Sequence, residues 1–172
     1  CCISSSATIS TSVCEQYTSP SGNYTWISSG TYTDTIQNVS GCDSILTIQL
    51  TIKQRTASTV NQSICQGQSF LFNGVTRNVQ GVYYDTLVNS VGCDSIVTLN
   101  LTVNSNPIAS ISPTTVAICS GSSATLTASG GTNYSWSNGL GTGVSKTVSP
   151  ASNTTYTVTV TDGNNCTATA TR

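Results

Sequence analysis

The sequence predicts an all-β fold in which two small, sandwich-like tandem repeats, each stapled by a disulfide, precede a third β domain. Three observations lead to this prediction. Apolar and polar residues alternate with period two in segments such as SILTIQLTIK (44–53) and TTYTVTVTD (154–162), as in half-buried strands. Short clusters of Gly, Asn and Ser separate these segments and supply turns. A stretch near the beginning of the chain recurs 51 residues later.

The internal repeat sets the expected domain organisation. Residues 7–53 align with 58–104 at 17 identical positions without a gap, and GCDSILTIQLTI falls on GCDSIVTLNLTV. Each unit is small for an independent domain, so it is expected to need a covalent staple. The chain after the linker VNSNP departs from the repeat. We therefore expect an N-terminal segment (1–6), two repeat units (7–54 and 55–105) and a third domain (106–172).

Composition excludes several classes of function. The 172 residues include 58 Ser and Thr, only 11 charged side chains and no His, and the net charge is −1. Such a chain has no basic surface for nucleic acid, no imidazole for acid–base chemistry or metal binding, and no apolar run long enough to span a membrane. A serine nucleophile would lack a partner base. The aspartates of the first repeat recur at equivalent positions of the second, whereas a catalytic pair of carboxylates is usually unique. We expect no enzyme activity, no cofactor and no metal.

The eight cysteines predict a disulfide framework and hence an oxidising compartment. The same 28-residue interval separates Cys14 from Cys42 and Cys65 from Cys93, which predicts one disulfide within each repeat. The two cysteines of the third domain predict a bond between Cys119 and Cys166. Cys1 and Cys2 remain, and three interpretations are open: bonds to another chain or domain, a mutual bond or exposed thiols, and lipidation of Cys1.

The repeat residues resemble a tandem module of large secreted surface proteins of Bacteroidota. Its pattern is an early Cys, then G-x-Y-x-D-[ST], then G-C-D-S-[IV] leading into an alternating strand. The matching residues are Cys14, Gly30, Tyr32, Asp34, Gly41, Cys42, Asp43 and Ser44, and Cys65, Gly81, Tyr83, Asp85, Gly92, Cys93, Asp94 and Ser95. The stretches ICSGSSATLTASGG, NYSWSNG and TYTVTVTDGNNC resemble the immunoglobulin-like or PKD-like modules of the same proteins.

This resemblance implies a function outside the cell. Such proteins are exported by the type IX route and form gliding or surface adhesins and cell-surface filaments. We therefore expect a non-enzymatic structural module that self-associates into a fibre or joins neighbouring modules end to end. The closing segment CTATATR is shorter than the final strand of such modules, so the sandwich is expected to leave an open edge for a neighbouring strand.

Four aspartates precede Ser or Thr and an apolar residue, which resembles the O-glycosylation motif of Bacteroidota. The implied glycan sites are Thr35, Ser44, Thr86 and Ser95. The alternative is that these aspartates cap turns. Calcium at Asp34 and Asp43, at Asp85 and Asp94, or near Asp162 is a further alternative, although acids are too sparse to supply its six to eight oxygens.

The two tryptophans suggest different roles. Trp136 in NYSWS is typical of the core tryptophan of a sandwich strand that packs near a disulfide. Trp26 has no counterpart in the second repeat, where Arg77 stands, so it either packs in the core or contacts a ligand. A carbohydrate-binding adhesive module is therefore an alternative function, and a passive spacer of a secreted hydrolase is another.

Overall fold

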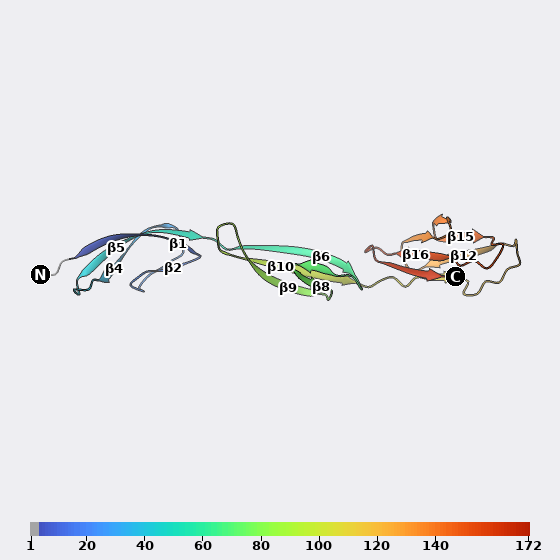
Figure 1. The fold of residues 1–172 in the computed structure, drawn as a ribbon, viewed down its shortest axis with the longest axis horizontal. Helices are drawn as coiled ribbons and strands as arrows, with labels where there is room; N and C mark the ends of the chain where they lie inside the picture. Colours follow the sequence, from blue (N-terminus) through green and yellow to red (C-terminus); the bar gives the residue numbers. More distant parts are fainter. Residues whose placement is uncertain (1–3) are drawn as a thin grey trace. The chain divides into compact units, whose positions relative to one another are not determined.

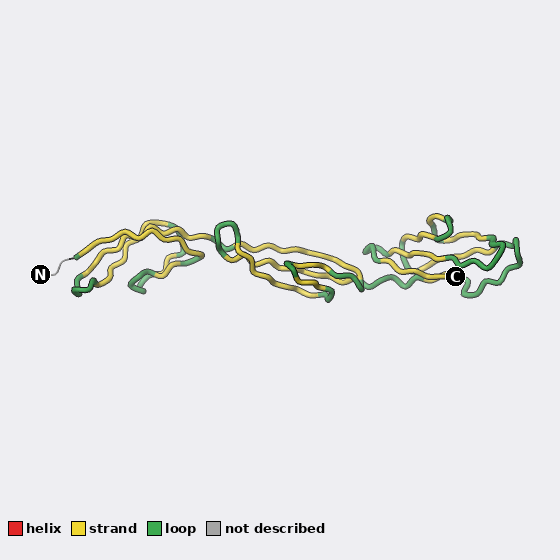
Figure 2. The backbone as a smooth tube through the Cα atoms, viewed as in Figure 1, coloured by secondary structure: helices red, strands yellow, loops and turns green. Residues whose placement is uncertain are grey.

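A computed structural model describes residues 4–172, which form strands and loops without a helix (Figure 2). The expectation of an all-β fold is confirmed. Within these residues no helix is long and apolar enough to cross a bilayer. The chain divides into two compact units. One contains the residues up to Val60 together with Tyr84–Thr98, and the other contains Asn61–Tyr83 together with Leu99–Arg172.

The first repeat is built around one long central strand. The sheet has the order β1 (Ser5–Cys14), β5 (Asp43–Lys53), β4 (Gly30–Gln37) (Figure 1). Strand β1 runs parallel to β5, and β4 runs antiparallel to it. A short hairpin, β2 (Tyr17–Thr18) and β3 (Thr25–Trp26), follows β1.

Alternation along β5 produces the core of this repeat. Leu46, Ile48, Leu50 and Ile52 are buried on one face of the strand, while the residues between them are exposed or half-buried. Partly buried side chains of β1 and β4 and of the hairpin pack against this apolar row. Burying each aliphatic side chain contributes about 1.5–3 kcal/mol, so the row is the main source of stability for so small a sheet.

The second repeat has the same plan. Its sheet has the order β6 (Thr56–Cys65), β10 (Asp94–Asn104), β9 (Gly81–Val88). The hairpin of β7 (Phe70–Phe72) and β8 (Val75–Arg77) takes the place of β2 and β3. Leu99 and Leu101 are the buried residues of the central strand, at the positions equivalent to Ile48 and Leu50.

The third domain is a two-sheet sandwich with the strand order of an immunoglobulin-like fold. One sheet contains β11 (Ser110–Ser112), β12 (Ala124–Ser129) and β15 (Ser145–Val148). The other contains β14 (Gly141–Thr142), β13 (Asn133–Trp136), β16 (Thr157–Thr161) and β17 (Thr167–Thr171). The inner faces of the two sheets form a single core.

Two expectations about this sandwich concern Trp136 and the last strand, β17. Trp136 is 5% exposed in the core, and its indole Nε1 donates a hydrogen bond to the Gly143 carbonyl at 2.8 Å, so the prediction of a core tryptophan is confirmed. Strand β17 pairs with β16 along its whole length, and further backbone hydrogen bonds join Tyr156 and Arg172. The far side of β17 is an edge of its sheet in the described part of the chain.

Candidate functional site

Three turns that carry a cysteine share one geometry. In each, the side-chain oxygen of Asn38, Asn89 or Asp162 accepts hydrogen bonds from the backbone N–H groups two and four residues later, at 2.8–3.1 Å. The residue before the cysteine has a positive φ, which suits Gly and Asn: 75° at Gly41, 84° at Gly92 and 62° at Asn165. We call Cys42, Cys93 and Cys166 the turn cysteines.

A second set of cysteines lies where the chain leaves a strand or approaches one. Cys14 ends β1, Cys65 ends β6, and Cys119 lies in the loop before β12. The carbonyl of each accepts a backbone hydrogen bond at 2.8–2.9 Å from the N–H of Gln16, Gln68 or Ser122 respectively, so each cysteine begins a tight turn. We call Cys14, Cys65 and Cys119 the strand-end cysteines.

The disulfides connect neighbouring modules. Cys14 bonds to Cys93, with 5.7 Å between the Cα atoms, and Cys65 bonds to Cys166, with 5.5 Å between them. Cys42 is also in a disulfide. Cys119 is free and exposed. The predicted bonds Cys14–Cys42, Cys65–Cys93 and Cys119–Cys166 are therefore wrong. Cys1 and Cys2 lie outside the described residues, and the interpretations of them remain predictions.

The length of the central strand explains this correction. Cys14 is aligned with Lys53 at one end of β5, whereas Cys42 immediately precedes Asp43 at the other end. The eleven residues of β5 separate these ends by about 35 Å at 3.3–3.4 Å per residue. A disulfide requires Cα atoms within about 7 Å. A strand-end cysteine therefore cannot reach the turn cysteine of its own repeat.

Polar contacts surround the Cys14–Cys93 bond. Arg55 Nε lies 3.1 Å from Glu15, and a second nitrogen of its guanidinium lies 3.9 Å from Asp94. Asn89, which forms the turn before Cys93, donates a hydrogen bond to the Gln54 carbonyl at 3.0 Å. These side chains are exposed, so the ion pairs contribute little to stability beside the covalent bond.

The predicted glycan acceptors lie in different environments. Thr35 on β4 and Thr86 on β9 are exposed. Ser44 is 5% exposed, and its hydroxyl hydrogen-bonds with that of Ser5 at 2.6 Å, while Ser95 is half-buried and accepts a hydrogen bond from Thr56. Glycosylation stays a prediction, and Thr35 and Thr86 are the acceptors whose surroundings leave room for a sugar.

Asp34 is a structural residue. The residue is 2% exposed, and its carboxylate accepts hydrogen bonds from the Ser21 N–H at 2.7 Å, the Ser21 hydroxyl at 2.6 Å and the Thr35 N–H at 2.9 Å. Burial alone would raise the pKa of Asp34, but hydrogen bonds from the side chain and backbone of Ser21, from Thr35 and from Ser19 hold this pKa below its ordinary value. The carboxylate thus fixes the β2–β3 loop to β4.

The calcium alternatives find no support in the described residues. Asp34 is aligned with Leu46 on β5, whereas Asp43 is aligned with Gln37, so the two carboxylates lie at different levels of the sheet. Asp162 accepts the two turn hydrogen bonds described above. Among residues 4–172 no group of three or more His, Cys, Asp or Glu side chains comes together to hold a metal ion.

Trp26 lies in an aromatic cluster of the first repeat. Its ring stacks with Tyr32 at a centroid distance of 4.4 Å, with Tyr24 at 5.9 Å and with Tyr17 at 6.2 Å. It also packs against the apolar row of β5, so the structure places it in the core, and its role as a ligand contact stays untested. Tyr24 is 52% exposed and forms the outer part of the cluster.

The second repeat replaces this stacking with a cation–π contact. The Arg77 guanidinium carbon lies 4.5 Å from the ring centroid of Tyr83, which corresponds to Tyr32. The hydroxyls of Tyr32 and Tyr83 donate equivalent hydrogen bonds to the carbonyls of Ser28 and Val79, at 3.0 and 2.7 Å. Trp26 and Arg77 thus occupy equivalent positions and cover equivalent tyrosines, Tyr32 and Tyr83.

Comparisons with known proteins identify no family. Models of known protein families do not match the chain, and neither do curated protein sequences. Among solved structures, the N-terminal four immunoglobulin domains of Dscam1 isoform 9.44 match at 17% identity with a TM-score of 0.31, covering 89% of this chain and 54% of that one. The N-terminal eight immunoglobulin domains of DSCAM isoform 1.30.30 match at 15% identity with a TM-score of 0.32, covering 88% and 31%.

Proposed function

We propose that this chain is a non-enzymatic structural segment of an extracellular, cell-surface filament or adhesin, in which β modules are joined end to end by disulfides between neighbours. The observation that carries the proposal is the pairing of strand-end with turn cysteines of successive modules. A bond within a module stabilises that module alone. A bond between modules also resists their separation.

The two described bonds overlap along the sequence. Cys14–Cys93 closes a loop with a sequence separation of 79, Cys65–Cys166 closes one of 101, and residues 65–93 belong to both. Loops of this size stabilise the folded state by about 4.5 kcal/mol each in the chain-entropy model, against about 3.5 kcal/mol for a 28-residue loop. The larger consequence is mechanical, because every point from Cys14 to Cys166 is bypassed by at least one covalent link.

The surface of the chain also supports an extracellular location. Disulfides persist in oxidising compartments, and the exposed positions of the strands are occupied mainly by Ser and Thr with few charges. The resemblance to secreted Bacteroidota modules points the same way, and we propose that Thr35 and Thr86 carry O-linked glycans.

Limited proteolysis tests the proposed pairing in the native protein. Trypsin should cut after Arg55, in the connection between β5 and β6. The proposal requires that the fragments 1–55 and 56–172 migrate together on a non-reducing gel and separate after reduction, because Cys14–Cys93 spans the cut. Fragments that separate without reductant would contradict it.

The cell surface provides a second test. After a membrane-impermeant reductant has opened any bond to a further module, a membrane-impermeant maleimide should label Cys119 on intact cells, because this residue is exposed. Pretreatment with a non-labelled impermeant maleimide should remove the signal. Labelling that occurs only after lysis would place the chain inside the cell and contradict the location.

A carbohydrate-binding adhesive module is the second candidate, and one observation favours it. Exposed Tyr24 stacks on Trp26 and offers an aromatic surface for a sugar ring. Loss of glycan-array binding in Tyr24→Ala would support this function, whereas an array without a bound glycan would remove it. Trp26→Ala is the poorer test, because Trp26 also holds the core. A passive spacer of a secreted hydrolase stays a third candidate.

A further inference from the structure

The third domain repeats the cysteine pattern of the first two modules. Tyr32, Tyr83 and Tyr156 each stand ten residues before a turn cysteine, and NYSW at 133–136 corresponds to NYTW at 23–26. Cys119 follows Ile118, as Cys14 follows Val13 and Cys65 follows Ile64. Each of these cysteines begins a tight turn through its carbonyl. Cys119 is therefore the third-domain equivalent of Cys14 and Cys65.

The bonds that these equivalents form have a direction. Cys14 of the first module bonds to the turn cysteine of the second, and Cys65 of the second bonds to the turn cysteine of the third. In both cases the strand-end cysteine reaches toward the C-terminal side of the chain. All three turn cysteines are already bonded, and Cys119 is the free thiol of the described residues.

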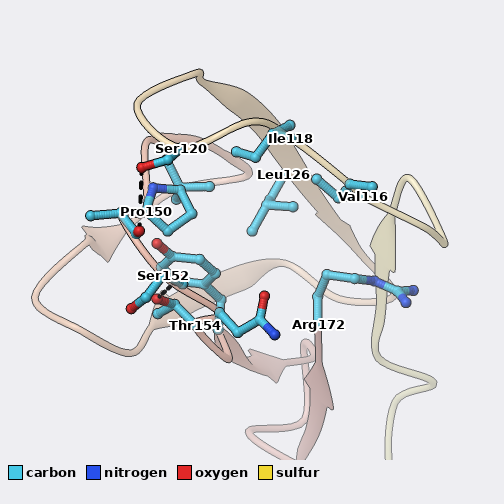
Figure 3. Close-up of a pocket in the computed structure, with 13 residues that line it drawn as sticks. Val116, Ile118, Ser120, Leu126, Pro150, Ser152, Thr154 and Arg172 are labelled. Carbon is cyan, nitrogen blue, oxygen red and sulfur yellow. Dashed lines mark hydrogen bonds between the residues drawn. The ribbon is translucent and has the colours of Figure 1, made fainter.

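Cys119 lies beside a hollow at one end of the sandwich. Its neighbours Ile118 and Ser120 line the hollow together with Val116, Leu126, Tyr156 and Arg172 (Figure 3). Tyr156 and Arg172 pair beyond the Thr157 and Thr171 end of β16 and β17, whereas Cys166 follows Thr161 at the other end. The free and the bonded cysteine of this domain thus lie at opposite ends.

The hollow itself contains groups suited to a bound chain. Leu126 and Tyr156 belong to the buried core, so the floor of the hollow is apolar. A peptide segment seated there would cover the half-buried side chains of Val116 and Ile118 and remove them from water.

We propose that Cys119 forms a disulfide with the turn cysteine of a following module of the same kind, seated at this end of the sandwich. The proposal rests on the proposed function and names its next partner: a turn of the form [Asn/Asp]-x-x-[Gly/Asn]-Cys leading into an alternating strand. Bond formation joins the two Sγ atoms and removes two protons and two electrons. A disulfide oxidant such as oxidised glutathione takes up the electrons and becomes two thiols.

A lengthened chain tests this partner directly. We would append a second copy of residues 54–104 after Arg172. The copy offers Cys119 two possible partners, the strand-end cysteine that corresponds to Cys65 and the turn cysteine that corresponds to Cys93. After oxidative folding, free thiols are alkylated and the disulfides are mapped by mass spectrometry. Only molecules that retain Cys14–Cys93 and Cys65–Cys166 are scored, so correct folding of the original modules is established in each one.

The proposal predicts that alkylation of Cys119 is lost and that its bond leads to the turn cysteine of the copy. Cys119→Ser should leave that turn cysteine alkylated and both original bonds intact. A bond from Cys119 to the strand-end cysteine of the copy would overturn the proposal, as would a free Cys119. Either result would leave the proposed function standing, because the link between modules on which it rests is carried by the two original bonds.

Discussion

Reduction should lengthen the chain under force by about 400 Å, against about 330 Å for disulfides within each module. The backbone between Cys14 and Cys166 runs through about 150 residues, or about 500 Å at 3.3–3.6 Å per residue. In the oxidised chain the shortest covalent route passes from Cys14 to Cys93, back along the backbone to Cys65, and on to Cys166. This route contains about 28 residues, or about 100 Å when fully extended.

Single-molecule stretching by the termini measures this difference. We expect the contour length of the fully unfolded chain to grow by about 400 Å when a reductant is added. The terminal attachments have the same length in both conditions, so they do not affect this difference. Removing one bond with Cys65→Ser and Cys166→Ser together should give an intermediate route of about 73 residues between positions 14 and 166, or about 250 Å.

Two outcomes would refute the reasoning. Local bonds within each module would leave about 49 residues on the shortest route, or about 170 Å, so an oxidised limit near that length would contradict the pairing. An oxidised chain that extends as far as the reduced one would show that no bond spans these residues.

Three further predictions concern single side chains. Because hydrogen bonds hold the pKa of Asp34 below its ordinary value of 3.8, the ionised carboxylate stabilises the fold at neutral pH, and this contribution is lost as pH falls through the folded pKa. Asp34→Asn should therefore lower the thermal midpoint at pH 7 but less so below about pH 3.8, and Asp85→Asn, whose carboxylate receives one backbone hydrogen bond from Thr86, should change it less. Trp26→Ala should cost about 3–5 kcal/mol in denaturant unfolding, and Arg77→Ala about 0.5–2 kcal/mol, because the first removes a core side chain and the second a cation–π contact. Equal costs would contradict the assigned roles. Gly130→Ala should cost at least about 1–3 kcal/mol, because a Cβ at this positive-φ position would overlap the Ile108 carbonyl, whereas Gly163→Ala meets open space and should stay within about 0.5 kcal/mol.

The strands could be predicted because their signal is local. The alternation in DSILTIQLTIK reports directly which side chains of β5 are buried, and Leu46, Ile48, Leu50 and Ile52 form the core as the pattern requires. The 51-residue repeat likewise predicted a second unit like the first, and the sheets of the two units share one strand order. Trp136 was identifiable because a lone tryptophan within an alternating strand is typical of a sandwich core.

The role of Asp34 was harder to predict from the sequence, because it depends on a contact with a loop. Ser21, which donates two hydrogen bonds to Asp34, lies 13 residues earlier in a segment of Ser, Pro and Gly without periodicity. Its equivalent position in the second repeat is Phe72, so the repeat provides no second example of this contact. Duplication of Asp34 and Asp85 therefore suggested one shared role where the two environments differ.

The disulfide pairing failed to follow from the sequence for a topological reason. Equal 28-residue intervals are compatible with bonds within a module and with bonds between successive modules. The choice depends on whether Cys14 lies near the beginning or the end of β5, and hence on whether β1 runs antiparallel or parallel to it. The alternation in SSATISTSVC has the same period in both directions, so it cannot decide. The parallel register, Ser5 with Ser44 and Cys14 with Lys53, carries Cys14 to the far end of the module, where only the next module supplies a turn cysteine. A parallel first strand of this length thus turns a repeated pair of cysteines into a chain of links between modules.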